Sequence, residues 1–252
     1  MNKPGSFGIG TWNLDWARRS EPHAYAQVLA DHPCDVWVLT ETRDEISPPK
    51  FAHSVSAAVR PRDDRRKWTP TSRWVTIWSH WRTSPVTTEV DDGRAACARV
   101  AGPDGQKLLV YGTVLPWNAD VLYRTKGEKT SAIARQFEDC RRLLAKNDGC
   151  RLVIAGDFNQ FMASQKSRET ETLQGAIEIG LRNLGMICVT APSLLGRQLP
   201  HQGIDHIAVP AAIADRFASA DAWSSSSKLS DHGGIVIAGV KAHRPTHRRP
   251  TR

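Results

Sequence analysis

The sequence predicts one mixed α/β domain within residues 1–240, followed by a basic tail of residues 241–252. Three observations lead to this prediction. Short apolar runs of strand length alternate with turn signals over about residues 5–240. Longer segments between them carry apolar residues at helical spacing. The apolar pattern stops after Val240, and the tail beyond it has the composition of a disordered segment.

The first half of the chain is predicted to be rich in strands. We expect strands at residues 7–12, 36–40 and 74–79, a helix ending near residue 31, and a hairpin of residues 95–101 and 107–115. Ser20, Glu21 and Pro22 offer the helix an N-cap, an acid and an early proline. Residues 74–79 are β-branched and aromatic, which favours a strand. The Pro-Asp-Gly turn between the hairpin segments joins them.

The second half alternates between helices and strands. We expect helices at residues 128–146 and 170–184, and buried strands at residues 152–155, 204–209 and 235–240. Both helices place apolar residues on one face, for example Ile133 and Phe137 in the first and Ile177 and Leu181 in the second. This order is typical of a mixed α/β domain.

The composition fits one globular domain. The chain has 252 residues, of which 40% are hydrophobic and 24% charged, and this excludes a wholly disordered, collagen-like or coiled-coil protein. Its five cysteines form no CxxC pair, which argues against a zinc ribbon or a disulfide framework. No apolar run reaches the ~18 residues of a membrane span, and the N-terminus lacks a signal-peptide core. We therefore expect a cytoplasmic protein.

The net charge of +8 is concentrated in two segments. Residues 60–74 hold six basic residues against two aspartates, and residues 241–252 hold five basic residues and no acid. Such patches favour phosphate-rich partners. Arg65 and Arg66 lie near Trp68 and Trp74, and arginine with an aromatic ring suits stacking on unpaired bases, so both arginines are candidate substrate contacts. A solvated loop, a core strand that begins at Trp74 and a solubilising tail are the alternatives.

Polar side chains interrupt or end five of the predicted strands. Asn13 and Asp15 end the first, Glu41 ends the second, Asp157 and Asn159 follow a third, Asp205 lies inside a fourth, and Asp231 and His232 precede the last. Taken singly, most of these acids are turn formers or helix caps. A carboxylate inside a strand, such as Asp205, is costly unless it is paired. If the strand ends converge, the set suits a hard metal ion, a general base and an imidazole.

The motifs TWNLD, LTET, GDFN, IDH and SDH, in this order and at these distances, resemble the endonuclease/exonuclease/phosphatase superfamily. That family includes exonuclease III-type AP endonucleases, DNase I and the neutral sphingomyelinases. The resemblance runs from about residue 7 to 238, and GDFN and SDH are its most specific motifs. It implies a DNase I-like four-layered α/β sandwich, with two mixed β-sheets face to face and helices outside. It also implies hydrolysis of a phosphate ester assisted by Mg²⁺, with Mn²⁺ as an alternative cation.

The resemblance also assigns metal-binding residues. Glu41 is the first choice for a direct Mg²⁺ ligand, since Mg²⁺ takes only one or two carboxylates and keeps several waters. Asp15 and Asp231 would complete its inner or outer shell, together with Asn13, which we group with the catalytic residues.

The remaining motif residues receive catalytic roles from the resemblance. Asp157 would hold and deprotonate the attacking water, and Asn159 would donate to a phosphate oxygen. His232 would contact the scissile phosphate as a cation or act as general acid. Asp205 would accept from the other nitrogen of His232 and raise its pKa. His206 follows Asp205 directly and points to the opposite face of the strand, so we expect it to be a packing residue.

One position departs from the family pattern. Many members have His, and the AP endonucleases have Tyr, at the position that matches Val114. Tyr111, Trp117 or Asn118 would replace that group in part. Trp117 and Asn118 follow Pro116 at the mouth of the strand and are our candidate substrate contacts. The departure argues against typical AP-endonuclease or DNase I activity.

Three functional hypotheses remain open. The first is a Mg²⁺-dependent nuclease acting on DNA or RNA, with no obligate protein partner. The second is a phosphatase or phosphodiesterase acting on a small-molecule or lipid-headgroup phosphate, whose basic tail lies on an anionic membrane. The third is a non-catalytic binding module, which the buried charges disfavour because a protein without activity has no need to keep them.

Overall fold

The computed structural model describes residues 7–59, 69–90, 93–102, 105–162, 173–195, 203–224 and 229–239. The predicted tail and the two candidate substrate contacts Arg65 and Arg66 lie outside these described residues. All five cysteines are free thiols, as the sequence pattern predicts. In the described part of the chain no helix is long and apolar enough to cross a membrane.

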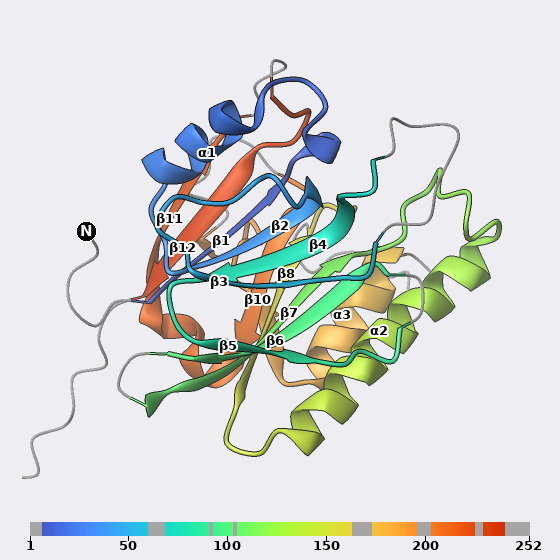
Figure 1. Cartoon of the computed structure of the whole chain (residues 1–252). Coiled ribbons are helices and arrows are strands. Elements are labelled where there is room, and N and C mark those ends of the chain that lie inside the picture. Colours follow the sequence, from blue (N-terminus) through green and yellow to red (C-terminus); the bar gives the residue numbers. More distant parts are fainter. Residues whose placement is uncertain are drawn as a thin grey trace, which may run out of the picture.

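Two mixed β-sheets of six strands each form the centre of the molecule (Figure 1). The first sheet has the order β11–β12–β1–β2–β4–β3, and the second has the order β5–β6–β7–β8–β10–β9. The strands of the first sheet are β1 (Gly8–Asn13), β2 (Val36–Arg43), β3 (His53–Ser56), β4 (Ser72–Ser79), β11 (Phe217–Trp223) and β12 (Gly234–Gly239). Those of the second are β5 (Thr83–Val86), β6 (Ala95–Ala101), β7 (Lys107–Val114), β8 (Arg151–Asp157), β9 (Met186–Cys188) and β10 (Asp205–Pro210).

Each sheet contains one parallel pair joined by a crossover helix. β1 and β2 are parallel and are connected through α1 (Pro22–Asp31), and β7 and β8 are parallel and are connected through α2 (Lys126–Lys146). Parallel strands need such a connection. Pro22 stands in the first turn of α1, and Thr125 and Glu128 form a capping box at the start of α2. The third helix, α3 (Leu173–Asn183), packs beside α2.

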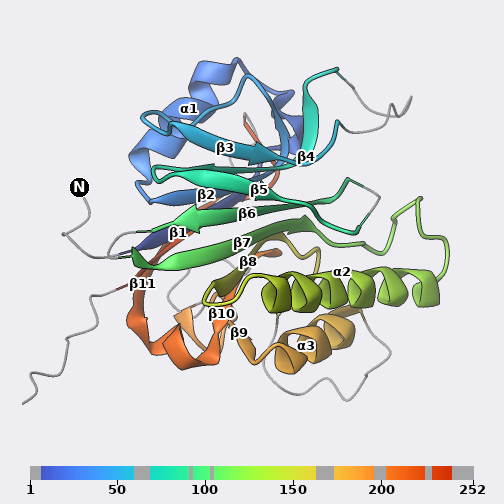
Figure 2. The ribbon, with the colours of Figure 1, turned by 60° about the horizontal axis from the view of Figure 1, so that its bottom comes forward.

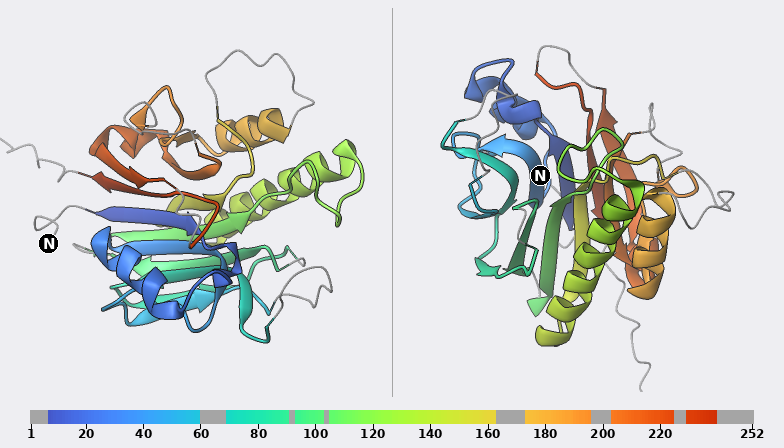
Figure 3. Two further views of the ribbon diagram at one scale, coloured as in Figure 1. Left: turned by 90° about the horizontal axis from the view of Figure 1, so that it is seen from above. Right: turned by 90° about the vertical axis from the view of Figure 1, so that its right-hand side faces the viewer.

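Three apolar clusters separate four layers (Figure 2). The central cluster lies between the sheets and joins Val38 and Ile77 of the first sheet to Val110 of the second. A second cluster packs the outer face of the second sheet against α2 and α3, and a third packs the first sheet against α1. Figure 3 shows α1 on one outer side of the molecule and α2 and α3 on the other. The predicted four-layered sandwich is confirmed.

The central strands and the helices appear where the sequence predicts them, but four strands were missed. These are β3, β5, β9 and β11, which are the four edge strands of the two sheets. Edge strands are half exposed and therefore lack the continuous apolar run of a buried strand. β9 has three residues, and β5 contains Pro85, which an edge strand tolerates. The first residues of the predicted helix 170–184 lie outside the described part of the chain.

The two sheets approach each other closely at Gly112 in β7. A Cβ atom there would lie 2.5 Å from Val75 Cγ1 and 2.9 Å from Val38 Cγ1, both in the first sheet. Because β-branched side chains in a packed core have little room to move, an added methyl group must push the sheets apart.

We predict that Gly112→Ala lowers the free energy of unfolding by about 1–3 kcal/mol, which is the usual cost of overpacking a core. Urea unfolding followed by tryptophan fluorescence measures it. Gly127→Ala in the first turn of α2 is the matched control, because the nearest atom to its Cβ would be Thr125 Oγ1 at 4.0 Å. Equal stabilities for Gly112→Ala and the wild type would contradict the sheet packing described here.

Candidate active site

The predicted site residues meet at one end of the two sheets because of the strand directions. Asn13 is the last residue of β1 and Asp157 is the last residue of β8, at the carboxyl ends of the two parallel pairs. β10 and β12 run antiparallel to β8 and β1, so their amino ends lie at the same edge. Asp205 is the first residue of β10, and His232 lies two residues before β12.

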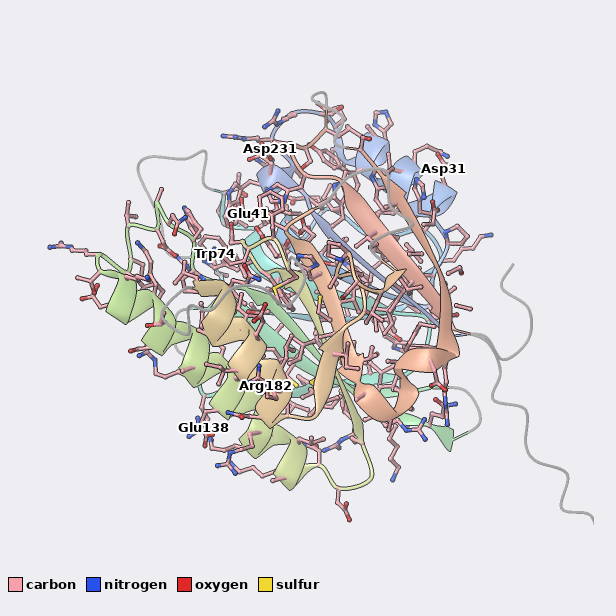
Figure 4. All side chains as sticks on the ribbon, turned by 180° about the vertical axis from the view of Figure 1, so that it is seen from behind. Asp31, Glu41, Trp74, Glu138, Arg182 and Asp231 are labelled. Atoms are coloured by element: carbon pink, nitrogen blue, oxygen red, sulfur yellow. The ribbon has the colours of Figure 1, made fainter. Side chains whose placement is uncertain are left out.

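A cleft of about 350 Å³ opens between these strand ends. Its walls are formed by Asp15, Arg18, Glu41, Trp117, Asp157, Asn159, Asp231 and His232. Figure 4 shows Glu41, Trp74 and Asp231 toward the same end of the molecule, away from Glu138 and Arg182 on the outer helices. Six of the eight lining residues belong to the sequence-predicted catalytic and metal sets, and Trp117 was a predicted substrate contact.

Asp157 and Asp205 face each other directly across β8 and β10. Gly156 precedes Asp157 with φ 138°, and a Cβ there would lie 2.0 Å from the Thr113 carbonyl oxygen, so only glycine fits this close approach of β8 to β7. Asn159 has φ 53° and turns the chain away after the strand. The GDFN motif is thus a tight strand exit that fixes the direction of the Asp157 side chain.

Both oxygens of the Asp157 carboxyl group accept a hydrogen bond. The Asn13 amide donates to Oδ2 at 2.9 Å, and the Asn159 backbone N–H donates to Oδ1 at 2.8 Å. Burial and the neighbouring Asp205 carboxylate raise the pKa of Asp157 from its ordinary value to about 8. The group is therefore fixed in orientation and has the pKa of a base that works near neutral pH.

His232 lies against Asp205. Its Nδ1 donates to Asp205 Oδ2 at 2.6 Å, and its side chain remains 17% exposed toward the cleft. Burial by itself would lower the pKa of His232, but the Asp205 carboxylate overrides this effect and raises it to about 10. Asp205 is the buried partner that the sequence led us to expect, and it stands at the start of its strand instead of inside it.

The SDH motif connects His232 to the first sheet. Ser230 Oγ donates to the Asn13 carbonyl at 2.7 Å and accepts from the His232 backbone N–H at 3.0 Å. The Trp12 indole donates to the His232 carbonyl at 3.1 Å. Ser230 is a local bridge, and it positions both the histidine and the end of β1.

Arg18 and Arg19 were missed in the sequence analysis. Both contact Asp15: the shortest distance to an Asp15 carboxylate oxygen is 2.8 Å from Arg18 and 2.6 Å from Arg19. Arg19 also lies 3.5 Å from Asp231. Asp15, Trp16 and Ala17 all have positive φ angles, which brings the arginines back over the end of β1. The signal was the Arg-Arg pair three residues after Asp15, which we did not interpret.

Glu41 lies within β2, whereas the sequence placed it at the end of a strand that stopped at Thr40. It has φ 44°, and the pairing with β4 skips it between Thr40 and Thr42. A positive φ is uncommon for a residue other than glycine and is found at functional sites. The register of the two strands is the same on both sides of this break, and Glu41 lines the cleft with 8% of its surface exposed.

The position that matches the family His or Tyr, and the residues proposed to replace that group, lie at different places relative to the cleft. Val114 is fully buried in the apolar cluster between the sheets. Tyr111 points to the other side of its sheet, where its hydroxyl donates to Asp139 at 3.2 Å, so it cannot serve the cleft. Asn118 is exposed and does not line the cleft, and its carbonyl accepts from Lys129 Nζ at 2.8 Å. Trp117 alone of these residues borders the cleft.

His206 packs away from the cleft, as its position next to Asp205 predicts. It is 2% exposed, and its ring nitrogens contact Thr190 Oγ1 at 2.9 Å and the Gln160 carbonyl at 3.0 Å. Burial lowers the pKa of His206 to about 4, so this histidine is neutral. It ties the loop after Asn159 to β10.

The donor set of the cleft fits a hard divalent cation. Glu41, Asp15 and Asp231 offer carboxylate oxygens, and Mg²⁺, Ca²⁺ and Mn²⁺ prefer oxygen ligands. One ligand atom each of Asp157, Asp205 and His232 lies within 4.8 Å of the others, which makes a second grouping. His232 suits it poorly, because its raised pKa keeps the imidazole protonated and Asp205 occupies Nδ1. Glu41 is therefore the better first ligand.

Comparison with solved structures agrees with this geometry. An AP endonuclease from Archaeoglobus fulgidus matches 92% of this chain and 98% of its own at 17% identity, with a TM-score of 0.66. The chain has the endonuclease/exonuclease/phosphatase fold. A Neisseria 3′ phosphatase bound to a product DNA hairpin shares that fold, with 20% identity, coverage of 92% and 98%, and a TM-score of 0.63.

A protein named for a lipid substrate has a similar fold. A sphingomyelinase C from Streptomyces griseocarneus matches 93% of this chain and 99% of its own at 18% identity, with a TM-score of 0.58. No protein-family model and no curated protein matches the sequence. Identities of this size show a shared fold and do not give the substrate.

We predict that His232 titrates far above the ordinary histidine pKa of about 6.5 when divalent cations are absent. Asp205→Asn removes the largest of the effects that raise this pKa and leaves burial, which lowers it, so the pKa of His232 should fall well below its wild-type value, while Asp157 and Asp231 still raise it. Histidine side-chain NMR between pH 5 and 11, assigned with His232→Gln, measures the change. Asp221→Asn is the control, since Asp221 contacts His32 at 2.8 Å and leaves His232 untouched.

The same shift affects stability. Protonated His232 stabilises the fold fully below pH 6.5, and this contribution is lost as the pH rises through about 10. An ordinary pKa for His232 in the wild type, or one that Asp205→Asn does not change, would contradict the arrangement.

Proposed function

We propose that the protein is a divalent-cation-dependent phosphodiester hydrolase that cleaves nucleic acid with water as the nucleophile. The observation that carries the proposal is the paired aspartates Asp157 and Asp205, with His232 against Asp205 in the cleft that Glu41 also lines. This set combines a base, a fixed cation and a candidate metal ligand. A non-catalytic module has no use for a buried base with a raised pKa.

Asp157 is the proposed base for the attacking water. Asn13 and Asn159 hold its two oxygens, so the carboxylate presents a fixed direction to the cleft. The amide of Asn159 itself donates to the Leu115 carbonyl at 2.9 Å, which holds this loop against the end of β7. Asn159 therefore supports the position of Asp157, and its predicted contact with a phosphate oxygen requires this hydrogen bond to be shared or exchanged.

His232 is proposed to act as a cation on the scissile phosphate. A general acid works best when its pKa lies near the working pH, and Asp205 raises that of His232 to about 10. A group that keeps its proton stabilises the negative charge that develops on the phosphate oxygens. Of the two roles that the resemblance allows, the raised pKa of His232 favours this one.

A divalent cation would complete the site. Among the described residues of the cleft and its rim, Asp15, Glu41, Asp157, Asp205 and Asp231 outnumber Arg18, Arg19 and His232. A phosphodiester is also an anion, so an acidic cleft repels it. A cation held by Glu41 would neutralise a non-bridging oxygen and stabilise the leaving oxygen.

Nucleic acid is the proposed substrate class. The basic segments 60–74 and 241–252 of the sequence suit a polyanion. Two proteins that share the fold are an AP endonuclease and a 3′ phosphatase bound to DNA. The sphingomyelinase supports a second candidate, a hydrolase of lipid-headgroup phosphodiesters.

A substrate panel tests the proposal. We predict Mg²⁺-dependent cleavage of plasmid, single-stranded DNA or RNA, abolished by EDTA. His232→Ala should lower the rate by at least about 10²-fold, in the range lost when a donor to a developing negative charge is removed. His23→Ala, on the exposed face of α1, should leave it unchanged. Cleavage of sphingomyelin alone would favour the second candidate, and hydrolysis of no phosphodiester would refute both.

Glu41→Gln tests the metal assignment. The amide is a weaker ligand for Mg²⁺, so we expect the Mg²⁺ concentration for half-maximal activity to rise about 10-fold or more. The shift in melting temperature with added Mg²⁺ should shrink as well, which checks binding independently of activity. Glu45→Gln is the matched control, because Glu45 is exposed and accepts from the Thr71 hydroxyl at 2.8 Å. An unchanged Mg²⁺ response in Glu41→Gln would remove Glu41 as a ligand.

A further inference from the structure

A row of stacked groups runs from the core between the sheets to the cleft. The ring of Trp16 packs edge-on against Trp74, with the ring centroids 4.7 Å apart. The Arg94 guanidinium lies 4.8 Å from the Trp74 ring centroid and 4.9 Å from that of Trp117. Trp117 is partly exposed and borders the cleft with Asp157, Asn159 and His232. We call this row the tryptophan–arginine stack.

A buried ion pair holds the stack in place. Both Arg94 terminal nitrogens donate to the Asp120 carboxylate, and the two side chains are only 4% and 0% exposed. A buried pair of this kind contributes little net stability, because the charges lose their hydration, but it fixes geometry. The pair therefore fixes the Arg94 guanidinium next to the Trp117 ring.

The same aspartate also fixes the backbone that carries Trp117. The Asp120 backbone N–H donates to the Trp117 carbonyl at 3.1 Å, and Asp120 Oδ1 accepts from the Leu122 N–H at 3.0 Å. Asp120 therefore restrains Trp117 through the arginine on its ring and through the turn that follows it. A rigid aromatic ring loses little conformational entropy when a ligand stacks on it.

We propose that Trp117 is a stacking platform for an unpaired nucleobase next to the scissile phosphate, and that Arg94 and Asp120 are its positioning residues. This inference rests on the proposed nuclease function and names the form of its substrate. Every base has a π-face, so such a platform binds single strands without sequence preference. Bases inside a duplex are already stacked, and only an unpaired or extruded base offers its face to the ring.

The position of Arg94 next to the Trp117 ring favours a neutral base over a cationic lipid headgroup as the ligand of that ring. An aromatic ring attracts cations through the negative charge density of its faces. The ring of Trp117 already interacts with the Arg94 guanidinium at 4.9 Å, so a quaternary ammonium would have to share the negative charge density of that ring with a second cation. A neutral base stacks without this competition. The charge arrangement therefore favours the nucleobase.

Binding of matched oligonucleotides to the full-length protein tests the proposal. The probes are fluorescein-labelled single-stranded dT8 and a base-free tetrahydrofuran 8-mer with the same phosphates, followed by fluorescence anisotropy in Ca²⁺. We expect the wild type to bind dT8 about 10-fold more tightly, as one stacked base provides. Trp117→Ala should reduce the preference to near unity and leave the affinity for the base-free probe unchanged.

Two variants control for structural effects. Trp117→Phe keeps an aromatic face and should retain most of the preference, even if packing on Arg94 is weakened. Trp81→Ala removes a partly exposed ring that stacks on Phe7 at 5.5 Å and does not line the cleft, and the preference should be unchanged. Equal losses for both probes in Trp117→Ala, or an unchanged preference, would overturn the proposal.

Two further outcomes separate this inference from the proposed function. Phosphocholine that competes with dT8 more strongly than thymidine monophosphate, through Trp117, would overturn the nucleobase and indicate a cationic headgroup. Hydrolysis of nucleic acid without a base preference that depends on Trp117 refutes this inference alone. A Trp117-dependent base preference without any hydrolysis of nucleic acid refutes the proposed function and leaves the stacking platform standing.

Discussion

Two aspartates, Asp157 and Asp205, face each other across neighbouring strands, and the imidazolium of His232 makes that arrangement stable. Like charges directly opposite each other destabilise a sheet, and burial increases the effect. His232 compensates Asp205, whereas Asp157 responds with a raised pKa. Asp205 therefore raises the pKa of both the base and the cation of the candidate site, and burial adds to the effect on Asp157.

That constraint depends on how the two sheets are joined. Asp157 and Asp205 belong to the second sheet, while Asn13 and the loop that carries His232 belong to the first. The Asn13 amide on Asp157 and the His232 ring on Asp205 link the two sides by hydrogen bonds. Close packing at Gly112 keeps the sheets at the distance these bonds need. The fold contributes to the chemistry because it holds the two sheets, and the site residues that each of them carries, at a fixed distance.

The sequence predicted the features that are local and missed those that are not. Buried central strands appear as apolar runs, and the polar residues at their ends indicated where the site lies. The break in the strand pairing at Glu41 and the stack behind Trp117 arise from contacts between distant segments, which no local pattern encodes. The arginines on Asp15 follow it by three and four residues, so that pattern was local and was overlooked. Asn118 shows the same limit, because adjacency to Trp117 in sequence did not place it in the cleft.

The central claim of the proposed mechanism is that water attacks the phosphorus in one step. Asp157 has both oxygens engaged by Asn13 and Asn159, which suits a carboxylate that holds water and not one that itself attacks phosphorus. Hydrolysis of a chiral phosphorothioate diester in oxygen-18 water tests this directly, because one in-line displacement inverts the configuration at phosphorus. The account predicts inversion. Retention would require two displacements through a covalent intermediate on the protein and would contradict it.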